Sequence, residues 1–181
     1  WSKESRYSKK INNDYDLENA LGYISINKDN IFVIEGIIKT PKLLKNQHFK
    51  TLTKDIISEV NSSECAKSKI SIINKIAQHP ELHKFENVAD NIGKVIRFTK
   101  TAEQAKVASK IIDNPKLFEY DNFTDHIEDV ISCAETNENA KAELDIIDKI
   151  GQNPQLFKYK NFTDNIGYII SEVDTPEKVE V

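Results

Sequence analysis

Apolar residues recur at helical spacing in the C-terminal third of the chain. Between residues 123 and 134 five of them fall on one face of a helix, at positions i, i+4, i+7, i+8 and i+11. They are Phe123, Ile127, Val130, Ile131 and Ala134. The stretch 162–173 repeats the same spacing. We therefore predict one amphipathic α-helix in each of these two stretches.

A second helix is predicted after each such stretch. Four hydroxyl residues stand where this helix would begin, and a Ser or Thr side chain can accept a hydrogen bond from the free amides of a first helical turn. They are Ser62, Thr101, Thr136 and Thr175. Apolar residues then follow at positions i, i+4, i+7 and i+10, as in Ala66, Ile70, Ile73 and Ile76. Each predicted unit is thus a pair of amphipathic helices.

Four prolines divide the chain at regular intervals. Each begins a Pro-x-Leu sequence, and they lie 39, 35 and 39 residues apart: Pro41, Pro80, Pro115 and Pro154. After the last two, NPKLFEYDNFTDHIEDVIS is matched by NPQLFKYKNFTDNIGYIIS. A repeat of this length indicates a stacked array of helical units. The short interval lacks about one helical turn, so the apolar faces stay nearly in phase.

We predict one continuous domain built from these repeats. Residues 1–39 form an N-terminal segment with a degenerate repeat, and complete repeats follow at 40–78, 79–113 and 114–152. Residues 153–181 form a truncated repeat. An array normally covers its last apolar face with a polar cap. We therefore expect the protein to continue beyond residue 181.

Asparagine precedes the first helix of three units. Asn87, Asn122 and Asn161 are each followed three residues later by Asp. Asn favours the position just before a helix, and Asp in the first turn favours the positive end of the helix. We predict these three asparagines to be N-caps.

The paired helices and the proline at each unit boundary resemble the α-solenoids of the HEAT and armadillo type. The resemblance covers roughly residues 17 to 181. It implies an all-α, right-handed α-solenoid of tandem two-helix repeats, about 35–39 residues each. It also implies a protein or peptide partner bound along an extended surface, although no residue motif is carried over. The tetratricopeptide pattern and the ankyrin signature do not align with the sequence.

Charge is distributed unevenly along the array. The net charge of the chain is −4, but residues 40–78 carry +4 and residues 114–152 carry −7. Three interpretations are open: a solvated face that keeps the array soluble, a bipolar strip that steers a partner, or head-to-tail contact between arrays.

The second helices often line the concave side of solenoids of this kind. On that analogy we expect eight of their charged residues to contact a partner: Lys67, Lys69, Lys75, Lys106, Lys110, Lys141, Asp145 and Asp148. The favoured function is a non-catalytic scaffold that binds a protein or peptide. The alternatives are a structural spacer or self-assembly module, and weak nucleic-acid binding by the basic region 40–113.

No motif for catalysis, a cofactor or a metal is expected to operate in this chain. We expect Cys65 and Cys133 to act as small apolar residues that fill space between helices and not as nucleophiles. His79 and His83 are four residues apart, but Pro80 lies between them, so we expect surface histidines and no metal site. Gly-rich phosphate loops and zinc-protease motifs are absent from the sequence. No apolar run reaches the ~20 residues of a membrane helix. We expect a cytoplasmic protein, with a secreted microbial effector as the alternative.

Overall fold

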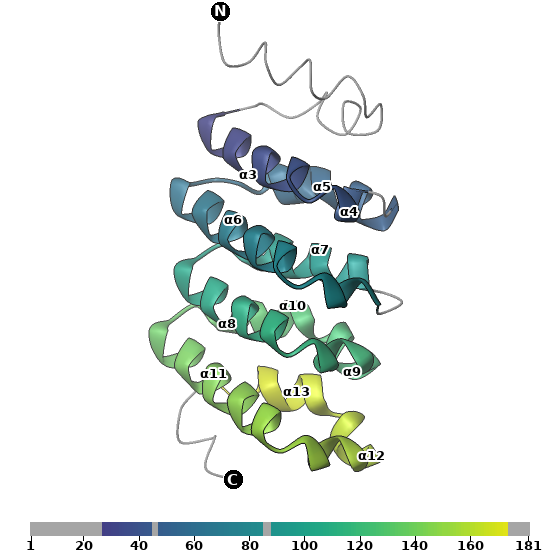
Figure 1. Ribbon diagram of the computed structural model, residues 1–181. Coiled ribbons are helices and arrows are strands. Elements are labelled where there is room, and N and C mark those ends of the chain that lie inside the picture. Colours follow the sequence, from purple (N-terminus) through teal and green to yellow (C-terminus); the bar gives the residue numbers. More distant parts are fainter. Residues whose placement is uncertain (1–26, 45–46, 85–87, 174–181) are drawn as a thin grey trace, which may run out of the picture.

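The computed structural model describes residues 27–44, 47–84 and 88–173 (Figure 1). Every regular element in these ranges is a helix, and no strand occurs there. This confirms the prediction of an all-α fold. The N-terminal part of the predicted degenerate repeat and the predicted cap Thr175 lie outside the described residues.

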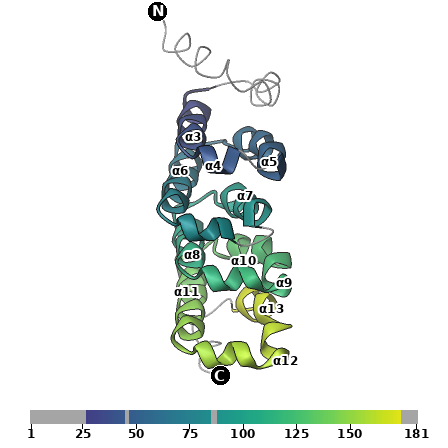
Figure 2. The same ribbon diagram turned by 45° about the vertical axis from the view of Figure 1, so that its right-hand side comes forward.

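Four helices lie side by side in one row, here called the second-helix row because each is the second helix of a predicted repeat. They are α3 (Lys28–Ile38), α6 (Ser63–Ala77), α8 (Ala102–Asp113) and α11 (Asn137–Gln152). Each helix contacts the next one in the row. Figure 2 shows them as one column running the length of the structure.

A parallel row is formed by the first helices of the predicted repeats. It contains α5 (Gln47–Ser58), α7 (Val88–Phe98), α10 (Ile127–Cys133) and α13 (Ile166–Ser171). Here too each helix contacts its successor, and the two rows contact each other through pairs such as α6 with α7 and α11 with α13. Two layers of helices therefore enclose the apolar side chains between them.

Prolines set the connections from the second-helix row back to the first. A short helix begins at each one: α4 (Pro41–Leu44), η1 (Pro80–Lys84), η2 (Pro115–Glu119) and η3 (Pro154–Lys158). Helical backbone angles are unfavourable for the residue before a proline. Accordingly Asn114 and Asn153 have non-helical backbone angles, with φ near −120° and ψ near 65°. The preceding helices α8 and α11 therefore end at these points.

Three of the four hydroxyl caps predicted for the second helices are confirmed. Ser62 accepts a hydrogen bond from the Cys65 amide at 3.1 Å, and Thr136 accepts one from the Asn139 amide at 3.1 Å. Thr101 does the same for the amide of Gln104 at 3.2 Å, while the Gln104 side chain accepts from the Thr101 amide to complete a capping box. Such caps typically contribute about 1 kcal/mol each.

The first helices of the last two units depart from the prediction. Each stretch was predicted as one helix, but the first is α9 (Asp121–Asp125) followed by α10, and the second is α12 (Lys160–Thr163) followed by α13. The prediction of N-caps is wrong for Asn122, which lies inside α9, and for Asn161, which lies inside α12, while Asn87 lies outside the described residues. The side-chain oxygen of Asn122 instead accepts a hydrogen bond from the Gly167 amide at 2.8 Å, which joins α9 to α13 of the next unit. A local motif was thus replaced by a contact between units.

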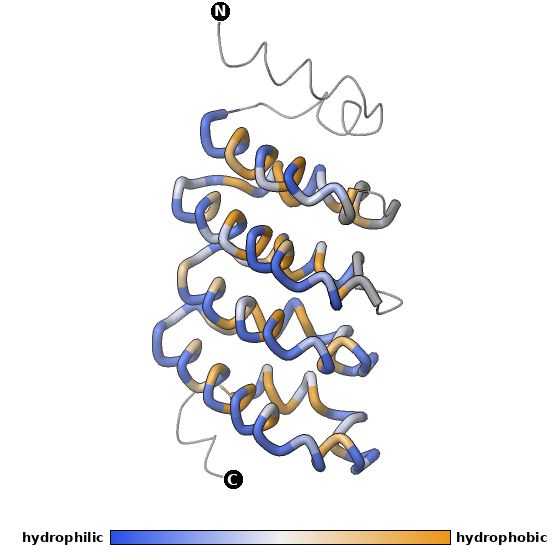
Figure 3. The backbone as a smooth tube through the Cα atoms, viewed as in Figure 1, coloured by the Kyte–Doolittle hydropathy of each residue, from blue (hydrophilic) through white to orange (hydrophobic). Residues whose placement is uncertain are grey.

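The core is continuous along the two rows of helices. One cluster of buried apolar residues extends from Val33 to Ile170, and many of its members are 0% exposed. Figure 3 shows apolar and polar stretches alternating along the helices of both rows. Aromatic side chains close the seam between the last two units, where Tyr120 stacks on Phe157 with ring centroids 5.1 Å apart. Within the described ranges, no helix is long and apolar enough to cross a membrane.

Close packing at Gly167 gives the first testable prediction. A Cβ atom at this position would lie 2.4 Å from the Asn122 backbone oxygen, whereas a Cβ at Gly36 would meet Ile73 at an ordinary 3.5 Å. We expect Gly167→Ala to lower the free energy of unfolding by ~1–3 kcal/mol through overpacking. The matched control Gly36→Ala should raise it by up to ~1 kcal/mol, because alanine favours a helix. Urea unfolding of both variants tests this, and equal effects would contradict the contact.

Candidate functional site

Counting from each N-cap brings equivalent positions of the second-helix row into register. The caps are Asn27, Ser62, Thr101 and Thr136. Five residues after them comes a set of side chains that are all exposed, here called the exposed row: Phe32, Lys67, Lys106 and Lys141. Phe32 is 46% exposed, although it is a large apolar residue. Three of the eight predicted contact residues therefore share one position on three neighbouring helices.

A second set lies three residues closer to the N-terminus of each helix. This acidic row consists of Asp29, Glu64, Glu103 and Glu138. Asp29 Oδ1 accepts a hydrogen bond from the Ser63 hydroxyl at 2.9 Å, and Glu64 Oε1 accepts one from the Ala102 amide at 3.4 Å. In both cases the acceptor is on one helix and the donor is the first residue of the next. Asp29 and Glu64 thus link the N-terminal ends of neighbouring helices.

Three other predicted contact residues form ion pairs between units. Lys75 Nζ on α6 lies 2.6 Å from Asp113 Oδ1 on α8, and His79 joins the same carboxylate at 3.2 Å. Lys110 on α8 pairs in the same way with Asp148 on α11. These side chains are half-buried and hold successive helices together, so they are less available to a partner than the sequence suggested.

The remaining exposed candidates differ in their partners. Lys106 Nζ lies 2.7 Å from Glu103 Oε2 on its own helix. Lys67, Lys141 and Asp145 are exposed and form no ion pair within the described part of the chain. Of the eight candidates, these three are therefore the charged side chains most accessible to a partner.

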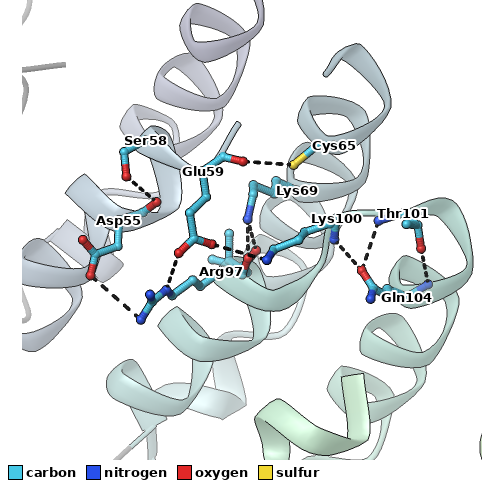
Figure 4. A network of polar contacts seen from close by, with 10 residues as sticks. Asp55, Ser58, Glu59, Cys65, Lys69, Arg97, Lys100, Thr101 and Gln104 are labelled. Carbon is cyan, nitrogen blue, oxygen red and sulfur yellow. Dashed lines mark hydrogen bonds and ion pairs between the residues drawn. The ribbon is translucent and has the colours of Figure 1, made fainter. Parts of the chain in front are cut away.

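The prediction that Lys69 contacts a partner is wrong. It is 0% exposed and cannot be a surface contact. Its Nζ donates hydrogen bonds to the backbone oxygens of Ile96 at 2.9 Å and Arg97 at 2.5 Å (Figure 4). The ammonium thereby caps the C-terminal end of α7, where unpaired carbonyls carry partial negative charge. Burial lowers the pKa of Lys69 from its ordinary value near 10.5 to about 8.

Ionic contacts surround this buried lysine (Figure 4). Arg97 Nε donates a hydrogen bond to Glu59 Oε1 at 2.8 Å, and this bond is the main cause of a raised pKa for the Arg97 guanidinium. Lys100 Nζ lies 4.0 Å from the other oxygen of Glu59, and Asp55 lies 4.0 Å from Arg97. The cluster joins α5 and α7 across the unit boundary.

Glu143 occupies the same register as Lys69, seven residues after the N-cap. The four residues at this register, here called the buried position, are Ile34, Lys69, Ala108 and Glu143. Glu143 is 0% exposed, and neither carboxyl oxygen has a hydrogen-bond partner in the structure. Burial raises its pKa from near 4.5 to about 8. The Cys133 thiol on α10 also has a raised pKa, because of burial and then the charge of Glu143.

The sequence held a signal for both buried ionisable residues. Lys69 follows Ala66 by three residues and precedes Ile73 by four, and Glu143 stands in the same way between Ala140 and Ile147. Both therefore fall on the apolar stripe of their helix. The prediction of a partner contact at Lys69 rests on its charge, whereas the position of both residues on the apolar stripe predicts burial.

Other candidate chemistry finds little support in the described residues. Cys65 is buried and its thiol donates to the Glu59 backbone oxygen at 3.8 Å. His79 Nδ1 lies 2.7 Å from Glu81 Oε1, and the side chain of His83 lies outside the described residues. No group of three or more His, Cys, Asp or Glu side chains that could hold a metal ion occurs in the described ranges.

No family model matches the chain, and neither the curated proteins nor the solved structures contain a match.

Removing the Lys69 side chain should destabilise the fold. We expect Lys69→Ala to lower the free energy of unfolding by ~2–4 kcal/mol, because it leaves a cavity and removes the donor from two carbonyls. The control Lys67→Ala, two residues away on the exposed face, should change it by less than ~0.5 kcal/mol. Denaturant unfolding of the two variants provides the measurement. Similar values for both would show that Lys69 is not buried.

Glu143 should make stability depend on pH. The unfolded carboxyl ionises near pH 4.5 while the folded one keeps its proton to about pH 8. The contribution of Glu143 to stability is therefore fully present below pH 4.5 and is lost as pH rises towards 8, at up to ~1.4 kcal/mol per pH unit. Glu143→Gln cannot ionise and should lack this component. Unfolding curves at several pH values, with the variant subtracted from the wild type, measure it. A flat difference would contradict it.

Proposed function

We propose that the chain is part of a right-handed α-solenoid that holds a protein or peptide partner without catalysing a reaction. The partner would lie along the solvent-exposed face of the second-helix row, here called the outer face. The repeated contact of each helix with its equivalent in the next unit supports the solenoid arrangement. It also gives the outer face a regular pattern, because equivalent positions recur from helix to helix.

The exposed row carries this proposal. Its lysines are solvated at one register, while most other charges of the second-helix row form contacts within or between units. Charges that a fold needs for its own stability are usually paired in this way. Lys67 and Lys141 have no such role in the described structure and are free to meet a partner.

A non-catalytic role is supported by where the unusual ionisable groups lie. Lys69 and Glu143 have the most strongly shifted pKa values, but both are 0% exposed. A general acid or base must come within hydrogen-bond reach of its substrate. Both side chains are better explained by contacts between helices.

Selection from a peptide library tests the proposal. A phage library of random peptides, long enough to span three helices, would be panned on the immobilised chain. We expect enriched peptides whose binding sites, mapped by amide NMR shifts, lie on α6, α8 and α11. Sites confined to the first-helix row would contradict the proposed face. Failure to enrich any sequence over the bare support would favour a structural spacer and overturn the proposal.

A further inference from the structure

The exposed row narrows the chemistry of the partner. We infer that Phe32, Lys67, Lys106 and Lys141 form a docking strip for an extended acidic peptide that carries a carboxylate at every third residue and an apolar side chain at its end. The inference rests on the proposed function, because it assigns a ligand to the same face. What it adds is a spacing and a charge that can be tested separately.

Spacing is the first step of the argument. Helices in direct contact lie about 8–10 Å apart, and α6, α8 and α11 each contact the next. The lysines of the exposed row share one register, so successive lysines are separated by about this distance. An extended peptide in the polyproline II conformation has three residues per turn and rises about 3.1 Å per residue. Every third side chain of such a peptide therefore points to the same side, advances about 9 Å and meets the next lysine.

Charge is the second step. The acidic row is adjacent to the exposed row and could repel an acidic ligand. However, Asp29 and Glu64 each accept a hydrogen bond from the start of the next helix, and carboxylates in a first helical turn are compensated by the positive end of that helix. Lys67 and Lys141 form no ion pair in the described structure, and only Lys141 has an exposed carboxylate, Asp145, one turn further along its helix. Charge complementarity therefore favours an anionic ligand over a cationic one.

The N-terminal end of the strip supplies an apolar contact. Phe32 stands where the next three helices have lysine, and it is 46% exposed on α3. Single exposed apolar residues are common on surfaces. Here the residue is in line with the charged row, so it can receive an apolar side chain of a ligand that already lies along the lysines.

A peptide fits this strip better than a nucleic acid does. Nucleic-acid binding depends on neutralising many closely spaced phosphates, whereas the exposed row offers one lysine on each of three helices, beside a row of carboxylates. Asp145 also stands four residues after Lys141, one turn along α11, and is exposed. Three widely separated cations in an acidic surrounding select for discrete carboxylates.

The test uses two synthetic peptides of identical composition and the full chain. One has the pattern Leu-x-x-Glu-x-x-Glu-x-x-Glu-x-x-Leu, which is suitable for either direction of binding, with Ser or Ala at x. The other has the three glutamates adjacent. We expect the periodic peptide to bind about fivefold more tightly in fluorescence anisotropy, and to weaken as NaCl rises from about 20 to about 300 mM. Equal affinities would overturn the spacing.

Matched variants locate the binding. Replacing Lys67, Lys106 and Lys141 together by Gln should weaken the periodic peptide about tenfold. The control replaces three exposed lysines outside the second helices, Lys39, Lys158 and Lys160, and should change the affinity less than twofold. Among single variants Lys106→Gln should lose least, because Lys106 already pairs with Glu103. Asp145→Asn should bind more tightly than the wild type.

The outcomes separate this inference from the proposed function. Library peptides that bind the second-helix row, together with periodic and adjacent peptides of equal affinity, would overturn the acidic spacing and leave the scaffold proposal standing. Binding sites on the first-helix row would overturn both. A single-stranded oligonucleotide that binds more tightly than the periodic peptide, and loses its affinity in the triple variant, would replace the peptide with a nucleic acid.

Discussion

Burial of one unit's apolar stripe against the next unit is the contact on which the rest of the structure depends. Each helix of a row packs on the next one in that row, and one apolar cluster extends from Val33 to Ile170. In the solenoid proposed above, stability is close to a sum of unit and interface contributions. A helix that is held on its inner side and by its two neighbours keeps its outer side for solvent or a partner.

The buried position shows what this packing demands. It holds Ile34, Lys69, Ala108 and Glu143 in turn, and each satisfies it differently. A long lysine reaches the carbonyls at the end of α7, whereas an alanine brings no polar group. Glu143 has no hydrogen-bond donor to compensate a charge, so burial favours its neutral form. One geometry can therefore accept opposite residue types, provided that the cost of desolvation is met or avoided.

Much of the fold could be predicted because its determinants are local. The hydroxyl caps, the prolines and the apolar stripes act within a few residues, and Ser62, Thr101 and Thr136 behave as expected. The predictions for Asn122 and Lys69 are wrong because the groups that bind these side chains are distant in sequence. Asn122 accepts a hydrogen bond from Gly167, 45 residues away, and Lys69 donates to Ile96 at the end of α7, 27 residues away. Periodicity reveals which face a residue occupies, but it does not reveal which backbone group lies opposite.

The exposed row and the acidic row stay aligned because the turn that α8 lacks lies at its C-terminal end. Helix α8 ends at Asp113, about one turn earlier after its cap than α6 and α11 do. Because the missing turn lies at the C-terminal end, every position counted from the N-cap is unaffected. Near the prolines the contacts come from different positions on each helix. Lys110 lies nine residues after its cap, whereas Lys75 lies thirteen residues after its own. Each nevertheless pairs with an Asp twelve residues after the next cap. A deletion at one end of a hairpin thus preserves a surface pattern at the other.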